Sequence, residues 1–322
     1  MEKKARNELN KNPVVIVVAV VLVVYALSMI FVLGWGLLSS LKSNLDFNTA
    51  QNYIDMPNMK WSEKEFTQLM NYQTVLLKTN LTFEAKYFSG FDLSTKQVHT
   101  TEGNYFVYLF NTLAYTLTGS VILAVVPAIG AYMCAKYKFL FSKIQINVYL
   151  LFMMIPIIGA YPAELTLLRT LGMYDTLWGN WIQKLHFSGM YFFVYLAFYQ
   201  GMADAYAEAA EIDGASQFSV LCSIILPLSI KTIGSVWLVQ FITLWNDYQV
   251  PMLYLPTIPT LAYVTYAFAN PVNGMKGLEN GIQGNTPVLI AACMLLAMPI
   301  LGIYIAFNQK MMGNISMGGI KG

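Results

Sequence analysis

Four carboxylates lie close together in a mostly apolar chain, in and just before the stretch AEAAEIDGASQFSVLCSIILP at residues 207–227. The four acids are Asp204, Glu208, Glu211 and Asp213. Alanines and one glycine separate them, so a second surface could approach the backbone closely. Carboxylates fix the register of such a contact through charge-assisted hydrogen bonds. The stretch therefore predicts a docking element without covalent chemistry. The alternative is a solvated loop whose acids only aid solubility.

On a helix, about 100° per residue places Asp204, Glu208 and Glu211 within a narrow arc. The opposite side would carry Tyr206, Ala209, Ala210 and Asp213. Gly214 has no Cβ and accepts left-handed geometry, so we expect the chain to turn there. The loop 201–217 should then form an L-shaped pair of short helices.

The composition indicates a membrane protein. The chain is 57% hydrophobic and 11% charged, whereas soluble domains contain about 25% charged residues. A membrane span needs about 20 mostly apolar residues, and no charged residue occurs from Asn12 to Leu41. We predict an all-α polytopic membrane protein. The net charge of +2 and the lack of a basic cluster indicate no nucleic-acid partner.

About six spans are expected: Pro13–Leu38, Tyr105–Cys134, Ile144 to about Leu165, about Leu177 to Gln200, Phe218–Trp245 and Pro287–Phe307. Prolines in the second, third and fifth spans should break or kink them. Lipid tolerates broken helices only where neighbours or a cavity satisfy the freed backbone groups. Several broken helices therefore favour a transport path over a simple anchor.

Short loops rich in lysine and arginine lie on the cytoplasmic side of membranes. One predicted side carries Lys3, Lys4, Arg6, Lys11, Lys136, Lys138, Lys143, Lys231, Lys310 and Lys321, whereas the other carries only Arg169, Lys184 and Lys276 in its short loops. The remaining six lysines lie in the long segment 39–104, to which the rule does not apply. Both termini should therefore be cytoplasmic.

Four regions follow from this topology. They are a cytoplasmic N-terminus with the first span (1–38), an extracellular cap-like insertion (39–104), the core with five spans (105–309) and a cytoplasmic tail (310–322). Unstructured loops as long as the insertion are uncommon. The apolar stretch 253–268 is too short to span and should be an outer re-entrant or surface segment.

The acidic stretch also carries a family resemblance. Glu208-Ala209-Ala210, Gly214 and Ile224-x-Leu226-Pro227 match the cytoplasmic EAA signature of permease subunits of binding-protein-dependent ABC importers. Asp213-Gly214-Ala215, Trp245-Asn246-Asp247 and Tyr108–Thr112 resemble motifs of the carbohydrate branch. The C-terminal Gly318–Gly322 resembles the tail of the second maltose-type permease subunit. The chain departs from the family in lacking a proline just before the signature.

The resemblance implies a type I ABC importer permease fold and a set of partners. These would be a second permease subunit in a heterodimer, two cytoplasmic ATPases, an extracellular or periplasmic binding protein and a carbohydrate substrate, in a bacterial cytoplasmic (inner) membrane. The loop would insert into an ATPase groove, with Glu208 paired to a basic group, Gly214 at the bend and the alanines in close contact. The implied coupling residues are Asp204, Glu208, Ala209, Ala210, Glu211, Asp213 and Gly214. The tail residues Gly318, Gly319, Ile320, Lys321 and Gly322 would reach into the ATPase dimer.

The sequence contains no Gly-Lys dipeptide and hence no phosphate-binding P-loop. We therefore expect no enzymatic activity, no cofactor and no metal in this chain, with ATP and magnesium bound by the partner ATPases.

Polar groups inside spans usually face the bundle interior. The candidates for the translocation path are Asn111, Glu164, Gln240, Asn246 and Asp247. The candidates for contact with the binding protein are Asn270, Asn273, Gly274, Asn280 and Gln283, in the glycine-rich loop before the last span. The alternatives are an ABC permease for a non-sugar solute, or an ion-coupled secondary transporter. The latter should show ionisable groups near the midplane and repeated halves, which the sequence does not show.

Overall fold

The computed structural model describes residues 13–48, 69–77, 81–89, 92–137, 140–154, 160–187, 189–270, 275–276 and 285–312. The chain divides into two compact units, Met1–Thr79 with Leu278–Leu295, and Asn80–Gly277 with Leu296–Gly322. The division falls inside the predicted insertion 39–104, so this segment contributes to both units.

Within the described ranges, four helical stretches are long and apolar enough to cross a membrane. They are Pro13–Ser40 (α2), Tyr105–Lys136 (α5), Gln217–Trp245 and Thr286–Phe307, the last within α15 (Thr286–Met312). Each contains an apolar run near the length that a bilayer requires. These helices confirm the first, second, fifth and sixth predicted spans to within a few residues, and the predicted helical membrane fold.

The third and fourth predicted spans each contain two helices. A break in the third span was expected from its prolines, whereas the break in the fourth span was not predicted. The third comprises α6 (Leu140–Met154) and α7 (Ala160–Thr170), and the fourth α8 (Leu177–Gln183) and α9 (Met190–Gln200). Pro162 lies in the first turn of α7, where a missing N–H leaves no helical bond unmade. Gly189 has φ +133°, which a helix cannot contain.

A π-helical turn, η2 (Leu221–Ile225), separates α11 (Gln217–Val220) from α12 (Leu226–Trp245). The Leu226 N–H donates to the Leu221 carbonyl, and Pro227 follows without an N–H to donate. Such wide turns occur where the regular helical ladder is interrupted. Pro227 therefore interrupts its span as expected, whereas α5 continues through Pro127.

In the first unit, α4 (Met70–Leu77) is held against the C-terminal end of α2. The Asn71 amide donates to the carbonyl oxygens of Ser40 at 2.7 Å and Lys42 at 2.8 Å. Carbonyls at a helix end have no partner within the helix, and this side chain supplies one. Phe47, in α3 (Asn44–Asn48), and Val75, in α4, are buried. The first part of the insertion thus folds against the helix that precedes it.

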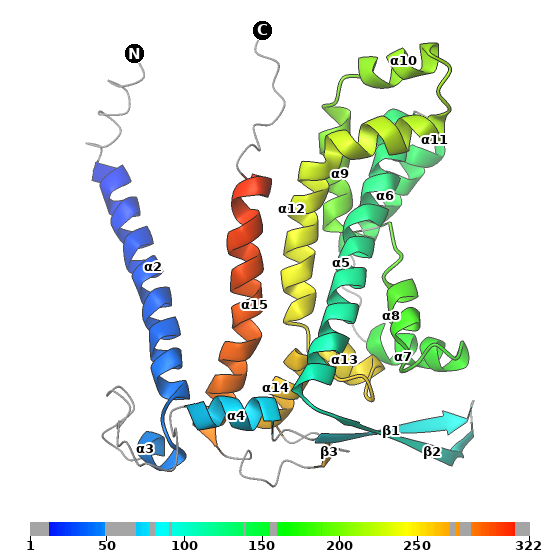
Figure 1. The fold of residues 1–322 in the computed structure, drawn as a ribbon. Coiled ribbons are helices and arrows are strands. Elements are labelled where there is room, and N and C mark those ends of the chain that lie inside the picture. The colour runs from blue at the N-terminus through cyan, green and yellow to red at the C-terminus, as the bar shows by residue number, and fades with distance from the viewer. Residues whose placement is uncertain are drawn as a thin grey trace. The chain divides into compact units, whose positions relative to one another are not determined.

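A small antiparallel sheet lies in the second unit, with strand order β2-β1-β3 (Figure 1). The strands are β1 (Leu81–Ser89), β2 (Asp92–Gly103) and β3 (Met275–Lys276). Thr82 pairs with Lys276 and Phe83 with Met275. The sheet therefore joins the insertion to the loop that precedes α15. The sequence analysis predicted a folded cap but not these strands.

The core of the second unit forms where α5 packs against α9 and α12. Ala124, Ala128 and Ala131 of α5 are fully buried there, and such small side chains allow helices to approach closely. Trp237 contacts Phe307 edge-to-face at 5.7 Å, and the Trp245 indole donates to the Leu296 carbonyl. The order of these two contacts along the chain shows that α12 and α15 are antiparallel. The segment 253–268 forms parts of two short helices, α13 (Gln249–Tyr254) and α14 (Leu261–Ala269). Its re-entrant or surface position stays a prediction.

Candidate functional site

The acidic stretch forms an elbow of two helices, α10 (Ala205–Ile212) and α11, which we call the α10–α11 elbow (Figure 1). Gly214 between them has φ +83°, so the expected left-handed turn is confirmed. The Ala215 N–H donates to the Ala210 carbonyl at 2.9 Å and closes α10. The Ser216 hydroxyl accepts from the Ser219 N–H at 3.2 Å and begins α11, as expected of a serine N-cap.

The inner face of the elbow consists of small side chains. Ala207, Ala210 and Ala215 pack against the buried cluster that α5, α9 and α12 form. Ala209, in contrast, is exposed. The two alanines of the EAA signature therefore lie on different faces, Ala210 toward the bundle and Ala209 toward the outside.

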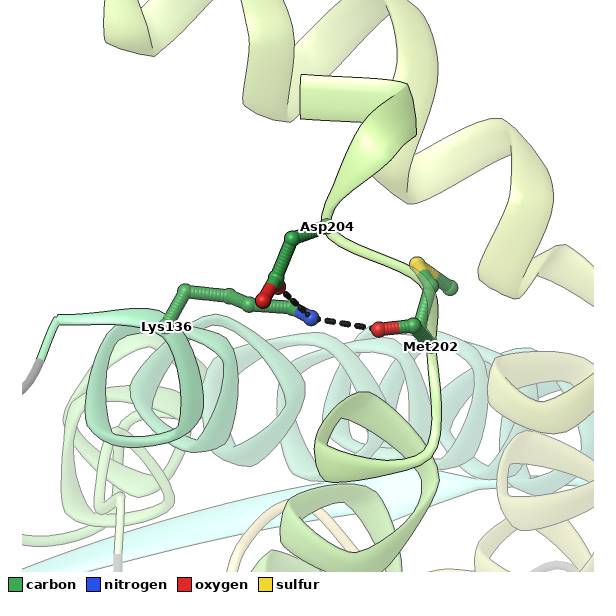
Figure 2. Close-up of polar contacts among 3 residues, drawn as sticks. All are labelled: Lys136, Met202 and Asp204. Atoms are coloured by element: carbon green, nitrogen blue, oxygen red, sulfur yellow. Dashed lines mark hydrogen bonds and ion pairs between the residues drawn. The ribbon is translucent and has the colours of Figure 1, made fainter. Parts of the chain in front are cut away.

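Asp204 at the start of the elbow is bound by the last turn of α5. The Lys136 ammonium lies 2.6 Å from the Asp204 carboxylate and donates to the Met202 carbonyl, also at 2.6 Å (Figure 2). The Lys136 side chain is 14% exposed and that of Asp204 is 67% exposed. Asp204 thus has a partner within the chain, which the sequence analysis did not foresee.

Glu211 is also engaged within the chain. Its carboxylate accepts a hydrogen bond of 2.7 Å from the Gln217 amide. The Tyr137 hydroxyl, one residue beyond α5, donates to the same Gln217 side chain. The second end of the elbow is therefore also connected to the end of α5.

Glu208 lies between these two acids and is exposed. Among the described residues, its carboxylate forms no ion pair or side-chain hydrogen bond. Three large apolar side chains are also exposed on the elbow: Tyr206 at 53%, Ile212 at 86% and Phe218 at 74%. Ile212 lies one turn after Glu208, so the two side chains share a helical face. The sequence analysis missed Ile212, although this spacing was visible in the sequence.

A second polar cluster joins two of the path candidates. The Glu164 carboxylate accepts hydrogen bonds from the Tyr254 hydroxyl at 2.7 Å and the Gln183 amide at 3.1 Å. The Asp247 carboxylate accepts one from the Tyr115 hydroxyl at 2.6 Å. Burial, with a smaller contribution from the Glu164 carboxylate, raises the pKa of Tyr254. This tyrosine therefore remains a hydrogen-bond donor at neutral pH.

Lys184 connects the two halves of this cluster. Its ammonium donates to the Asn180 side chain and lies 4.6 Å from the centre of the Tyr115 ring. The Asn180 amide in turn lies 3.4 Å from the Gln183 side-chain oxygen. Lys184 is 9% exposed, whereas the sequence analysis counted it among loop cations. The aromatic face beneath this cation offsets part of the cost of its burial.

The remaining path candidates lie apart from this cluster. Asn111 donates to the Pro259 carbonyl at 3.1 Å, and Asn246 donates to the Ile242 carbonyl of its own helix. Gln240 is half-buried in α12. Whether any of the five contacts substrate stays a prediction.

Most residues predicted to bind the solute-binding protein or the ATPase dimer lie outside the described residues. These are Asn273, Gly274, Asn280, Gln283 and the tail residues Gly318, Gly319, Ile320, Lys321 and Gly322. Asn270 is exposed at the end of α14, where its amide contacts the Tyr266 carbonyl at 3.3 Å.

The fold is similar to a chain of a bacterial ABC transporter involved in the import of the acidic polysaccharide alginate. The TM-score is 0.68, the match covers 91% of this chain and 95% of the other, and 19% of residues are identical. No family model matches the chain. The chain therefore shares the fold of that transporter chain.

Several curated relatives are named as permeases of sugar transport systems. The chain is 26% identical over 215 residues to the trehalose permease SugB of Mycobacterium tuberculosis, covering 66% of this chain and 76% of SugB. It is 24% identical over 228 residues to the maltose/maltodextrin permease MalG of Vibrio parahaemolyticus, covering 67% of this chain and 72% of MalG. It is 23% identical to the arabinooligosaccharide permease AraQ of Bacillus subtilis, over 68% of this chain and 74% of AraQ.

Proposed function

We propose that the chain is a permease subunit of an ATP-driven importer and forms half of the path for a sugar or oligosaccharide. The names of the relatives, which transport trehalose, maltodextrins and arabinooligosaccharides, support this cargo. The complex would contain a second, different permease subunit, two ATPases that bind ATP and magnesium, and an extracellular binding protein. It would reside in a bacterial cytoplasmic membrane with both termini of the chain inside the cell.

The observation that carries this proposal is the sorting of polar and apolar groups on the α10–α11 elbow. Asp204 and Glu211 have partners within the chain, whereas Glu208 is exposed without one among the described residues. Exposed Ile212 and Phe218 lie on the same two short helices. A carboxylate among exposed apolar side chains is typical of a binding surface. We infer that an ATPase covers it.

The test is a Glu208→Lys substitution in the importer purified with its ATPase subunits and reconstituted into vesicles. Reversal of the charge should repel the basic partner of Glu208. We expect ATPase retention, the amount of ATPase that remains bound to the purified chain, to fall by about tenfold or more, as for truncation of a well-packed interface contact. Sugar uptake should fall to the same extent, while the chain still enters the membrane. Glu164→Gln is the matched control, because Glu164 accepts its hydrogen bonds in the other polar cluster. This substitution should leave ATPase retention unchanged.

The same vesicles distinguish the alternatives. Uptake should require internal ATP and should persist when a protonophore collapses the proton gradient. Uptake that depends on the gradient and not on ATP would support an ion-coupled transporter instead. Full ATPase retention and full uptake with Glu208→Lys would contradict the role of the elbow.

A further inference from the structure

The C-terminal end of α5 contacts the connector that precedes α10 and, through Gln217 of α11, the end of α10. Lys136, in its last turn, contacts the Asp204 carboxylate and the Met202 carbonyl before α10. Tyr137, the next residue, donates to Gln217, whose amide donates to Glu211 near the end of α10. Two consecutive residues of one long helix thus connect to the start and to the end of a short one.

The geometry at Lys136 suits a firm connection. An ammonium offers three donors, and this one serves a carboxylate and a backbone carbonyl of the same short connector (Figure 2). A lysine in the last turn of a helix also interacts favourably with the helix dipole. The side chain is only 14% exposed, so packing restricts its motion more than that of a surface lysine.

Helix α5 extends from this contact to the second polar cluster. It has 32 residues, which corresponds to about 48 Å at 1.5 Å per residue. Nearer its other end, Tyr115 donates to Asp247 and Asn111 to the Pro259 carbonyl. Between these points it packs against α9 and α12. A displacement applied at Lys136 therefore has a continuous helix along which it reaches Asp247.

We propose that Lys136 is a positioning residue for coupling, which makes α10 and α5 move together when an ATPase displaces the elbow. This inference rests on the proposed function, since it presumes that α10 is the part on which the ATPase acts. Glu208 would then bind the ATPase, and the Lys136–Asp204 pair would pass the displacement to the helix bundle. Loss of the pair should leave the ATPase bound but make its hydrolysis less productive.

The experiment measures sugar molecules imported per ATP hydrolysed in the reconstituted full importer. Lys136→Met and Asp204→Asn each remove the ion pair, and only the first also removes the contact with the Met202 carbonyl. We expect both to lower this ratio by about two- to fivefold, which corresponds to the free energy that an exposed ion pair contributes. ATPase retention should be unchanged. Lys136→Arg should retain most of the ratio, and the exchange Lys136→Asp with Asp204→Lys should restore part of it. Lys143→Met, an exposed lysine on the same predicted side, is the matched control.

An unchanged ratio in Asp204→Asn and Lys136→Met, together with lost ATPase retention in Glu208→Lys, would overturn the inference and leave the proposed function intact. Loss of ATPase retention in Asp204→Asn would also overturn it, because the pair would then only maintain the shape of the docking surface. No effect of Glu208→Lys on retention or uptake would instead contradict the role of the elbow in the proposed function. Asp204→Asn leaves α5 unaltered, so a failure of Lys136→Met to enter the membrane does not affect the test.

Discussion

The acids of the elbow differ in what they contact. Asp204 and Glu211 bind groups of the same chain, Lys136 and Gln217 respectively. An exposed carboxylate whose partner is already in place gains little by binding a second cation. Glu208 has no such partner among the described residues and is exposed to solvent. Asp213, which follows α10, is likewise exposed without a side-chain partner among the described residues. Under the proposed function, Glu208 and Asp213 are therefore the acids of the stretch that remain available to an ATPase.

The backbone at Gly214 leads to a prediction at the same scale. Its φ of +83° strains an L-residue, whereas no neighbouring atom lies within 4 Å of the position that a Cβ would occupy. Gly214→Val should therefore cost about 1–3 kcal/mol through backbone strain at the turn. We expect a misplaced α10, reduced ATPase retention and slower uptake, measured in the reconstituted complex.

A series of substitutions isolates this strain from side-chain bulk. Gly214→Asn should be milder than Gly214→Val, because asparagine enters the left-handed region more readily. Gly201→Ala is the matched control, since Gly201 ends α9 with φ −81° and a Cβ there would meet only ordinary contacts. Equal behaviour of Gly214→Val and Gly201→Ala would contradict the strain argument.

At the scale of elements, uninterrupted apolar runs made the long helices predictable. The first span was expected at Pro13–Leu38 and is found at Pro13–Ser40. Breaks were harder to predict, because Gly189 interrupts an otherwise apolar stretch by backbone conformation and not by composition. The strand β1 was missed although Leu81–Ser89 largely alternates apolar and polar residues, as half-buried strands do.

Long-range pairing accounts for what the sequence could not show at the site. The acidic stretch, its glycine turn and Glu208 were all found by local spacing. Lys136 and Asp204 are separated by 68 positions, and no local pattern links them. The exposure of Ile212 likewise depends on which face of α10 packs against the bundle. The alanines alone do not indicate this face, because it depends on neighbours from distant parts of the sequence.

The apolar face of α10 gives a prediction for the element as a whole. Ile212 is 86% exposed, so Ile212→Asp should leave the isolated chain as stable as before. If an ATPase covers this side chain, about 1.5–3 kcal/mol of burial is lost. ATPase retention in detergent should then fall by about tenfold or more. Leu45→Asp is the matched control, because Leu45 is 85% exposed but lies in α3, within the insertion. Unchanged retention with Ile212→Asp would place the ATPase contact elsewhere.

At the scale of the whole molecule, the sheet links two segments that lie far apart in the sequence. Strand β1 of the insertion pairs with β3, which lies in the loop expected to contact the binding protein. In the sheet order β2-β1-β3, β1 is the central strand and uses both of its edges. The insertion therefore supports this loop through backbone hydrogen bonds. If the loop contacts the binding protein, the insertion contributes to the affinity even without touching it.

This support leads to a prediction for assembly outside the cell. Phe83→Pro removes a backbone donor from the central strand at the position that pairs with both Thr101 and Met275, and proline is not accommodated within a ladder. Titration of the binding protein against the ATPase activity of the reconstituted importer should then show a weaker apparent affinity, with the same maximum rate at saturation. Ser89→Pro is the matched control, since Ser89 ends β1 where the register is already irregular. An unchanged apparent affinity with Phe83→Pro would mean that the loop acts without the sheet. A lower maximum rate would mean that the sheet supports the helix bundle and not the docking of the binding protein.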